Sequence, residues 1–290
     1  MEKTKGIAFG IIAAFIYGFT PILGKLTFLE GSNTMSLAFY RNLLSVPFLF
    51  LMLKYKKVDL KISKVQCKKL AILASLGTSL TSLSLYGSYN YITVGMATTI
   101  HYIYPVLVAA ASIMIFKERI SIEKLLALLL STAGVAMFFE GDFNIIGVLL
   151  AFLSGVIYAS HILFIDRSGL NTMYPFKITF YLSIFSSLYL FLAGLLSDSL
   201  VFAMTPKGWL FTITVAFLVG FLANTFIPIS IKYSGPTVTS IVGLFEPITS
   251  IVTGILFLSE PLTIKSVIAC ILILLGVAII TLAKEHKPNK

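Results

Sequence analysis

Long apolar stretches recur from one end of the 290-residue chain to the other, separated by polar turn residues. Each stretch is close to the roughly 20 residues that an α-helix needs to cross a bilayer. The separators are short and rich in Gly, Asn, Ser and Pro, which is typical of turns. The pattern predicts ten membrane-spanning helices, at residues 6–27, 34–53, 70–92, 95–116, 123–139, 145–165, 175–196, 208–231, 236–258 and 264–283.

The composition agrees with the membrane class. Hydrophobic residues make up 58% of the chain and charged residues 12%, and the mean hydropathy is +0.97. A soluble domain is nearer half apolar and a quarter charged. A β-barrel would show short segments of alternating polarity, and the sequence lacks them. We therefore expect an all-α integral membrane protein with no room for a separate soluble domain.

Basic residues are distributed unevenly between the connecting loops. Seven lysines fall within 54–69, and most of the 22 Lys and Arg residues lie on this same side of the predicted spans. The opposite side carries Lys25, Lys207 and Lys265. Because cytoplasmic loops are enriched in Lys and Arg, we predict a multi-pass protein of the cytoplasmic membrane with both termini in the cytoplasm. The lysine run is then a contact for anionic lipid, and no nucleic-acid site is expected.

The sequence resembles itself after a shift of about 141 residues. The segment "AAFIYGFT" (13–20) lies over "SGVIYASH" (154–161), and "YPVLVAAASIMIFKERIS" (104–121) lies over "EPITSIVTGILFLSEPLT" (246–263). Five spans per half is an odd number, so the second half would be inserted upside down, as in many secondary transporters. We predict two inverted five-helix repeats, residues 1–141 and 142–290.

Two longer stretches carry a resemblance to a known family: "YNYITVGMATTIHYIYPVLVAAASIMIFKERIS" and "IKYSGPTVTSIVGLFEPITSIVTGILFLSEPLT". Each has a short hairpin, a span with a central proline, a glutamate (Glu118 or Glu260), and a closing span with a glycine (Gly134 or Gly276). In these features the whole chain resembles the EamA-like members of the drug/metabolite transporter superfamily. The resemblance implies a ten-helix carrier of small metabolites, such as amino acids or organic cations, often moved outward.

Pro105 and Pro247 occupy matching positions in the two halves, each near the middle of a predicted span. A proline removes one backbone hydrogen bond and leaves a carbonyl without its donor. At membrane depth such a group must be satisfied by protein or by cavity water. Since transporters place substrate sites at interrupted helices near the midplane, we predict two broken helices lining one central cavity. Packing kinks remain the alternative.

Ionisable and aromatic residues at similar depth are candidates for substrate binding. A charged side chain within a span is costly and usually faces the bundle interior or a water path. The candidates are His101, Tyr104, Glu246, Arg41, Tyr17, Tyr158 and His161. Arg41 is expected toward the outer mouth and His161 toward the inner one. The tyrosines could instead pack between helices, the histidines and Glu246 could make structural hydrogen bonds, and Arg41 could snorkel outward or bind Glu30.

These features favour a secondary active exporter that works by alternating access, as a monomer or weak dimer, on a small-molecule substrate. Protons are a candidate coupling ion, and no cofactor is expected. Cys67 and Cys270 have no second Cys or His at ligand spacing, so no disulfide or metal site is predicted. An intramembrane enzyme is one alternative, although His101, His161 and His286 form no H-E-x-x-H motif. A channel, which usually has a pore loop or an oligomeric ring, is another.

Overall fold

The computed structural model describes residues 2–118, 120–139, 144–258 and 262–282, and all regular structure within them is helical. Two residues named in the sequence analysis, Glu260 and His286, lie outside these ranges. Eight described helices are long and apolar enough to cross a membrane. They are Glu2–Leu29, Thr34–Tyr55, Lys64–Ser88, Met96–Met114, Ile145–Arg167, Pro175–Leu196, Pro206–Ser234 and Ile264–Leu282.

The two other predicted spans also correspond to helices, but shorter ones. Residues 123–139 match α9 (Ile122–Ala136), which has 15 residues. Residues 236–258 match two helices, α14 (Pro236–Gly243) and α15 (Glu246–Leu258). Neither stretch reaches the length of an uninterrupted span, because α9 ends early and the other stretch is broken in its middle.

The described helices are interrupted ahead of both central prolines, Pro105 and Pro247. Helix α7 (Val94–His101) ends before Pro105, and α8 begins at Tyr104 and runs to Met114. In the second half α14 ends at Gly243, and α15 begins at Glu246, directly before Pro247. Proline suits the first turn of a helix because the missing N–H would have no partner there. Each proline therefore both prevents one continuous helix and starts the next.

The first half contains further interruptions that the sequence analysis did not predict. The first span is divided into α1 (Glu2–Tyr17) and α2 (Thr20–Leu29). The second is divided into α3 (Thr34–Leu43) and α4 (Ser45–Tyr55). Their counterparts by the sequence shift, α10 (Ile145–Arg167) and α11 (Pro175–Leu196), are continuous. The two halves therefore differ in backbone detail where their sequences differ in proline content.

Two segments of π-helix occur at positions related by nearly the same sequence shift. One, η1 (Leu73–Ser79), joins α5 (Lys64–Ile72) to α6 (Leu80–Ser88). The other, η3 (Ala216–Ala223), joins α12 (Pro206–Val215) to α13 (Asn224–Ser234). π-Helical turns are rare and are found most often at functional sites. Their matched placement directs attention to the residues that pack against them.

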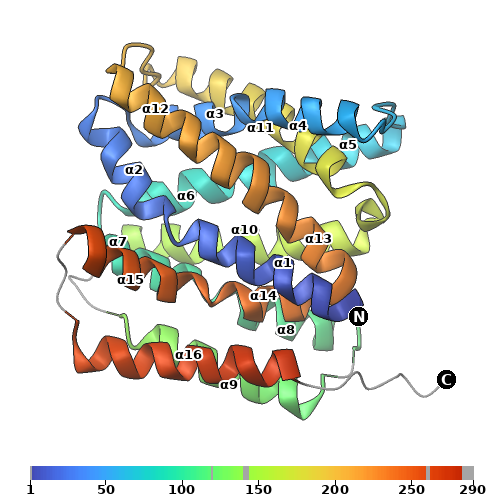
Figure 1. Cartoon of the computed structure of the whole chain (residues 1–290), viewed down its shortest axis with the longest axis vertical. Helices are drawn as coiled ribbons and strands as arrows, with labels where there is room; N and C mark the ends of the chain where they lie inside the picture. The colour runs from blue at the N-terminus through green and yellow to red at the C-terminus, as the bar shows by residue number, and fades with distance from the viewer. Residues whose placement is uncertain (1, 119, 140–143, 259–261, 283–290) are drawn as a thin grey trace.

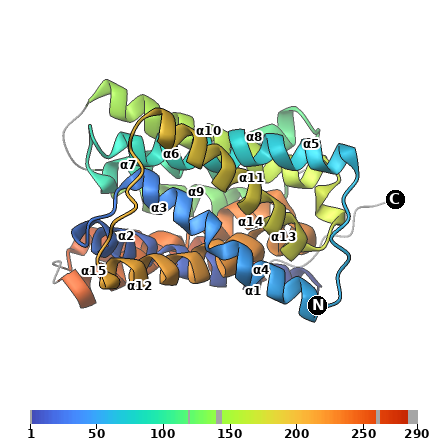
Figure 2. The same cartoon turned by 90° about the horizontal axis from the view of Figure 1, so that it is seen from above.

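The helices run side by side across the molecule, and the two halves are interleaved (Figures 1 and 2). Helix α1 packs against α13 and α14 of the second half, and α10 packs against α6, α7 and α8 of the first. Helices α9 and α16 (Ile264–Leu282) form a pair along the lower edge of Figure 1. Each half therefore places its first long helix inside the other half, and the space between them is enclosed by both.

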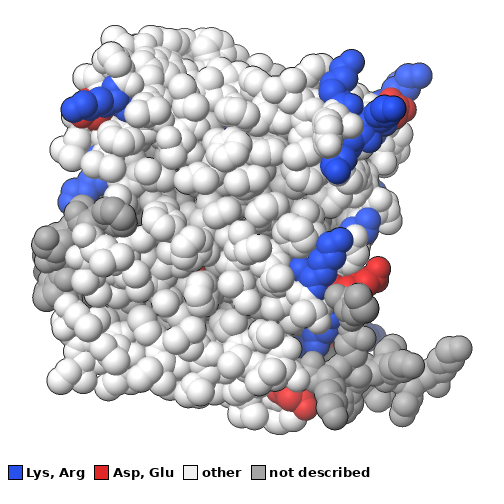
Figure 3. Space-filling view, viewed as in Figure 1, with Lys and Arg blue, Asp and Glu red and all other residues white. Residues whose placement is uncertain are grey.

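The surface has the character of a protein that sits in lipid. On the face in Figure 3, Lys and Arg gather at the end where Figure 1 marks the N-terminus, with a smaller group at the opposite end. The area between is nearly free of charged side chains. Large apolar side chains such as Leu129, Leu149 and Leu192 are exposed on the described helices. An apolar band between two charged ends is the surface that a bilayer covers.

Candidate functional site

A cavity of about 880 Å³ lies between the interrupted helices. Its wall takes residues from both halves of the chain, including α1, α3, η1 and α7 from the first and α10, α11, α13 and α15 from the second. The volume is in the range of small-molecule sites in proteins. The cavity therefore occupies the place that the repeat interface would give to a substrate.

Among the described residues, the cavity wall reaches one end of the molecule. It extends to Lys25 and Phe28 at the end of α2, and to Lys265 and Ser266 at the start of α16. No residue of the lysine-rich stretch 54–69 lines it. The mouth thus faces away from the lysine-rich stretch, on the side that the charge distribution predicts to be external.

The seven predicted binding residues all line this cavity, and so does Pro247: the seven are Tyr17, Arg41, His101, Tyr104, Tyr158, His161 and Glu246. Pro105 does not, and the expectation that both prolines border the cavity is wrong in this respect. Pro105 is buried, directly after Tyr104, whose side chain does line the cavity. Successive residues on a helix point about 100° apart, so the proline ring faces the protein instead.

Five aromatic rings of the cavity wall form a connected group, in which Tyr102 contacts His101 and Tyr104. The His101 ring centroid lies 5.5 Å from those of Tyr104 and Tyr158, and the latter two lie 4.8 Å apart, edge to face. His161 stacks on Tyr158 with centroids 6.0 Å apart. Aromatic pairs in these geometries add stability beyond the area they bury. They also present rigid faces and polar edges to a ligand.

The hydrogen bonds of His101 determine which of its nitrogens carries a proton. Its Nδ1 lies 2.8 Å from Ser154 Oγ, and Ser154 Oγ donates its only proton to the Ala151 carbonyl. Ser154 Oγ can therefore only accept from His101, so Nδ1 is the protonated nitrogen of the ring. In the neutral ring, Nε2 is then a hydrogen-bond acceptor for a ligand, whereas in the other tautomer Nε2 would be a donor.

His161 occupies space that a glycine in the π segment provides. A Cβ atom on Gly77 would overlap the imidazole at Nδ1. The Nδ1 atom is buried and has no hydrogen-bond partner, and the ring lines the cavity. The π-helical segment η1 thus places Gly77, which has no side chain, against the His161 ring at the cavity wall.

Glu246 is the first residue of α15, at the break in the second half. The N-terminus of a helix presents free N–H groups and a partial positive charge, which favour a carboxylate there. The Tyr102 hydroxyl hydrogen-bonds to this carboxyl group. No ion pair joins Glu246 to a cation in the described part of the chain. Its carboxyl group therefore remains available to a cationic group or a proton.

Arg41, on α3, lines the same cavity, in addition to Lys25 and Lys265 at the mouth. It does not bind Glu30, which instead accepts a hydrogen bond from Thr205. Its terminal nitrogens donate to Ser82 Oγ at 3.1 Å and Tyr86 Oη at 3.3 Å. Both partners are neutral, so no carboxylate among the described residues balances the guanidinium.

The sequence analysis missed several lining residues that belong to α6 and its neighbours. Thr78, Ser82 and Tyr86 recur every four residues in a span that also contains other hydroxyl residues, and all three line the cavity. Residues four apart share one face of a helix, so this polar stripe was a usable signal. By contrast, Asn224 accepts a 2.5 Å hydrogen bond from Tyr17 across 207 positions of sequence, and nothing local indicates it.

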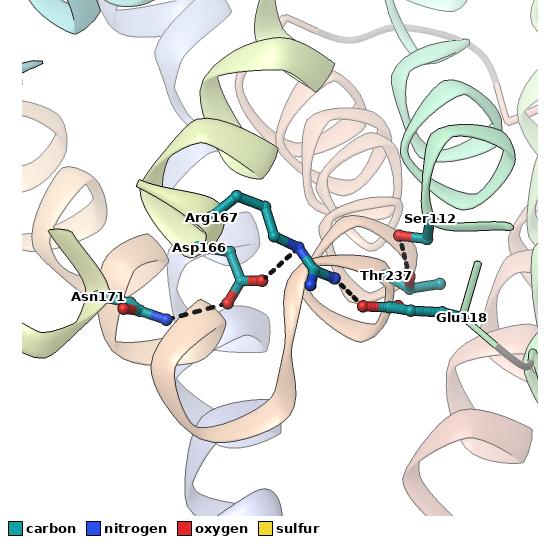
Figure 4. A network of polar contacts seen from close by, with 6 residues as sticks. All are labelled: Ser112, Glu118, Asp166, Arg167, Asn171 and Thr237. Atoms are coloured by element: carbon teal, nitrogen blue, oxygen red, sulfur yellow. Dashed lines mark hydrogen bonds and ion pairs between the residues drawn. The ribbon is translucent and has the colours of Figure 1, made fainter. Parts of the chain in front are cut away.

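The end of the molecule opposite the mouth is closed by polar contacts between the halves (Figure 4). Arg167, at the end of α10, forms ion pairs with Glu118 and with Asp166, and its guanidinium lies 4.3 Å from the Phe116 ring centroid. Nearby, Thr237 of α14 donates to Ser112 of α8 at 3.4 Å. These contacts join α8 and the segment directly after it to α10 and α14.

The helical fold and the apolar belt define a polytopic membrane protein built around a central cavity. The sequence profile of the EamA-like transporter family matches this chain twice, over residues 4–139 and 145–282. The chain belongs to that family.

Similar proteins are also named as transporters. An uncharacterized transporter of Archaeoglobus fulgidus is 27% identical over 90% of this chain and 92% of its own length. The uncharacterized transporter YvbV of Bacillus subtilis is 27% identical over 68% of this chain and 67% of its own length. An uncharacterized transporter of Haemophilus influenzae is 27% identical over 54% of this chain, and the match spans about half (51%) of that protein.

One solved crystal structure has the same fold as this chain. Its TM-score is 0.83, and the match covers 96% of each chain at 14% sequence identity. At that identity the likeness concerns the arrangement of helices alone. The family, the relatives and the helices together indicate a transporter rather than an enzyme.

Proposed function

We propose that this protein is a secondary active transporter that moves a small metabolite, an amino acid or an organic cation, across the cytoplasmic membrane by alternating access. The observation that carries the proposal is the central cavity, which is open at one end and lined by polar groups of both halves at their broken helices. Carriers bind substrate at such a place and expose it to one side at a time.

In this proposal the chain crosses the membrane ten times, as two inverted repeats of five spans. The sequence shift, the double family match and the paired π segments support it. So does the exchange of α1 and α10 between the halves. In an inverted repeat the two halves have similar structures but face opposite sides of the membrane. Exchanging the conformations of the two halves then converts an outward-open cavity into an inward-open one.

The proposed orientation places both termini in the cytoplasm and the cavity mouth outside. The N-terminal end of α1, which carries Lys3 and Lys5, lies at the end of the molecule opposite the mouth, and so does α5, which the lysine-rich stretch 54–69 enters (Figure 1). Enrichment of Lys and Arg on cytoplasmic segments supports this assignment. The described conformation would then be outward-open, and transport would be export, with protons as the candidate coupling ion.

The test is uptake and efflux in proteoliposomes that contain the purified protein. A thermal-shift screen of amino acids and organic cations first identifies ligands, because a ligand that binds the native state raises the melting temperature. Each hit is then loaded inside the vesicles, and its efflux is followed with and without a pH gradient. Saturable efflux that protein-free vesicles lack supports the proposal. A protein that binds these ligands but moves none of them, or that turns them over chemically, contradicts it.

A further inference from the structure

The cavity holds a buried cation, Arg41, that no carboxylate among the described residues pairs with. Only 8% of the Arg41 surface is exposed, yet both of its hydrogen-bonding partners, Ser82 and Tyr86, are neutral hydroxyls. Its Nε is buried and has no hydrogen-bond partner at all. Removing one partner of a buried charge is strongly destabilising, so a guanidinium in this position needs a counter-charge or water. Arginine cannot escape the cost by losing its proton.

The geometry points to a ligand group of defined chemistry. A guanidinium presents its N–H donors in a planar fork that matches a carboxylate, which can accept two parallel hydrogen bonds. The Ser82 hydroxyl proton is used in a bond to the Thr78 carbonyl, whereas Tyr86 Oη accepts from Arg41 and keeps its own proton to donate. One guanidinium and one free hydroxyl suit a singly charged anion. A phosphate dianion would need further cations, and the described wall adds only Lys25 and Lys265, at the mouth.

We propose that Arg41, together with the Tyr86 hydroxyl, forms a carboxylate subsite of the substrate cavity. The inference rests on the proposed function and decides between its two substrate classes. A substrate that is only a cation would leave Arg41 uncompensated and would be repelled by it. The substrate therefore carries a carboxylate.

The second charge of the cavity identifies the other end of the same molecule. Glu246 lines the cavity from α15, and it makes no ion pair with Arg41. Two opposite charges that share a cavity and remain apart can both be satisfied by one ligand with an anionic and a cationic group. The substrate is then a small zwitterion, with its amine at Glu246 and its aliphatic or aromatic part against the rings of His101, Tyr104 and Tyr158.

The experiment measures binding to the purified full-length protein by thermal shift and calorimetry. The probes are the twenty common L-amino acids and, for each one that binds, its carboxamide and its decarboxylated amine. Wild-type protein is expected to bind the acid roughly 10- to 100-fold more tightly than the amide or the amine, since hydrogen bonds to charged groups are the strong ones. Arg41→Gln should remove this preference by weakening the acid alone.

Further variants keep the test decisive. Two milder variants serve if Arg41→Gln does not fold. Arg41→Lys retains the charge without the planar fork, and Tyr86→Phe removes the hydroxyl donor. Each should lower the affinity for the acid several-fold. Lys207→Gln removes an exposed cation from the same end of the molecule and should leave all affinities unchanged. Three results would each overturn the subsite. The wild type could bind acid, amide and amine equally, or Arg41→Gln could keep wild-type affinity for the acid. The third is that phosphate esters alone stabilise the protein.

The outcome also separates this inference from the proposed function. If wild-type proteoliposomes carry a decarboxylated amine, and Arg41→Gln carries it equally well, the protein is a transporter but the carboxylate subsite is wrong. If wild-type protein binds amino acids through Arg41 but no vesicle experiment shows their movement, the subsite holds and the transport proposal fails.

Discussion

Arg167 and Glu118 form an ion pair between the end of α10 and the segment after α8, at the closed end of the molecule (Figure 4). Both side chains are about one-third exposed (35%). A pair this exposed contributes at most about 1 kcal/mol, because solvent screens it. It can still shift a conformational equilibrium severalfold, since 1.4 kcal/mol corresponds to a factor of ten.

We therefore expect Glu118→Gln to open the closed end more often. A cysteine at Ser230, which is fully buried at that end, reports the opening when Cys67 and Cys270 are replaced by serine. Its labelling by a membrane-impermeant maleimide from the lysine-rich side should become roughly two- to fivefold faster in Glu118→Gln. The reversed pair Glu118→Arg with Arg167→Glu should restore slow labelling, and Lys64→Gln should have no effect. Unchanged labelling in Glu118→Gln would show that other contacts hold this end closed.

The two π segments give a prediction about stability. A Cβ on Gly220 would lie 2.5 Å from the Arg41 carbonyl oxygen, which is backbone and cannot rotate away. Gly220→Ala should therefore destabilise the fold by about 1–3 kcal/mol, the usual cost of overpacking. Gly87→Ala is the matched control, because its new methyl group would meet only Leu150, at 3.8 Å. Thermal unfolding in detergent compares them, and an equal melting temperature for both variants would contradict the close packing at η3.

Gly77 should respond differently from Gly220. The obstacle to a Cβ there is mainly the His161 ring, which can move, although Leu73 Cδ1 also lies at 3.0 Å. We expect Gly77→Ala to lose less stability than Gly220→Ala but to bind ligand more weakly, because His161 would be displaced into the cavity. Ligand titration together with thermal unfolding separates the two effects. Wild-type affinity in Gly77→Ala would show that His161 is not positioned by η1.

His101 offers a test of its assigned tautomer. Asparagine places its amide nitrogen where Nδ1 of His101 lies, so it can keep the hydrogen bond to Ser154. Asparagine is too short to place a group at the position of Nε2, which glutamine would reach. If Nε2 accepts a hydrogen bond from the ligand, His101→Asn should retain the melting temperature but lose affinity severalfold. Ser154→Ala should lower stability by about 1 kcal/mol, because Nδ1–H is left buried without an acceptor. Full affinity in His101→Asn would assign His101 to packing alone.

The features of the fold that could be predicted from the sequence are those that follow from a local property of the chain, such as a proline or a long apolar stretch. The breaks ahead of Pro105 and Pro247 follow from the missing N–H, and the spans follow from apolar length. The break at Leu44 comes shortly before Pro47 and could have been predicted in the same way. The π turns could not, because they depend on what packs against the backbone, such as the Arg41 carbonyl on Gly220. Helix length near α9 was also overestimated, since apolar residues continue past its end at Ala136.

The site was predictable to the extent that isolated polar residues in apolar spans reveal themselves. Tyr17, Arg41 and Glu246 were recognised in this way, and all three line the cavity. Pro105 was misplaced because sequence gives its depth but not the direction of its ring. The hydrogen bond from Tyr17 to Asn224 and the unsatisfied Nε of Arg41 belong to tertiary structure, so only the structure could show that this arginine lacks a counter-charge.

Glu246 is the residue on which transport should depend most directly. Its carboxyl group lies at the start of α15, contacts Tyr102 and lines the cavity. An ionised and unpaired carboxylate at this depth would cost several kcal/mol, so it must be protonated, solvated by the cavity, or paired with a ligand cation. Glutamine keeps the shape and the hydrogen-bonding partner but removes both the charge and the titration.

We expect Glu246→Gln to fold with a wild-type melting temperature and to fail in transport in one of two distinguishable ways. If the carboxylate couples transport to protons, efflux from proteoliposomes should become independent of the pH gradient while ligand still binds. If it pairs with the substrate amine, affinity should fall roughly 10- to 100-fold, as for other charged hydrogen bonds. Glu30→Gln removes a carboxylate outside the cavity, one that is bonded to Thr205, and should behave as wild type. A Glu246→Gln protein with unchanged rate, affinity and pH dependence would show that the carboxyl group is structural.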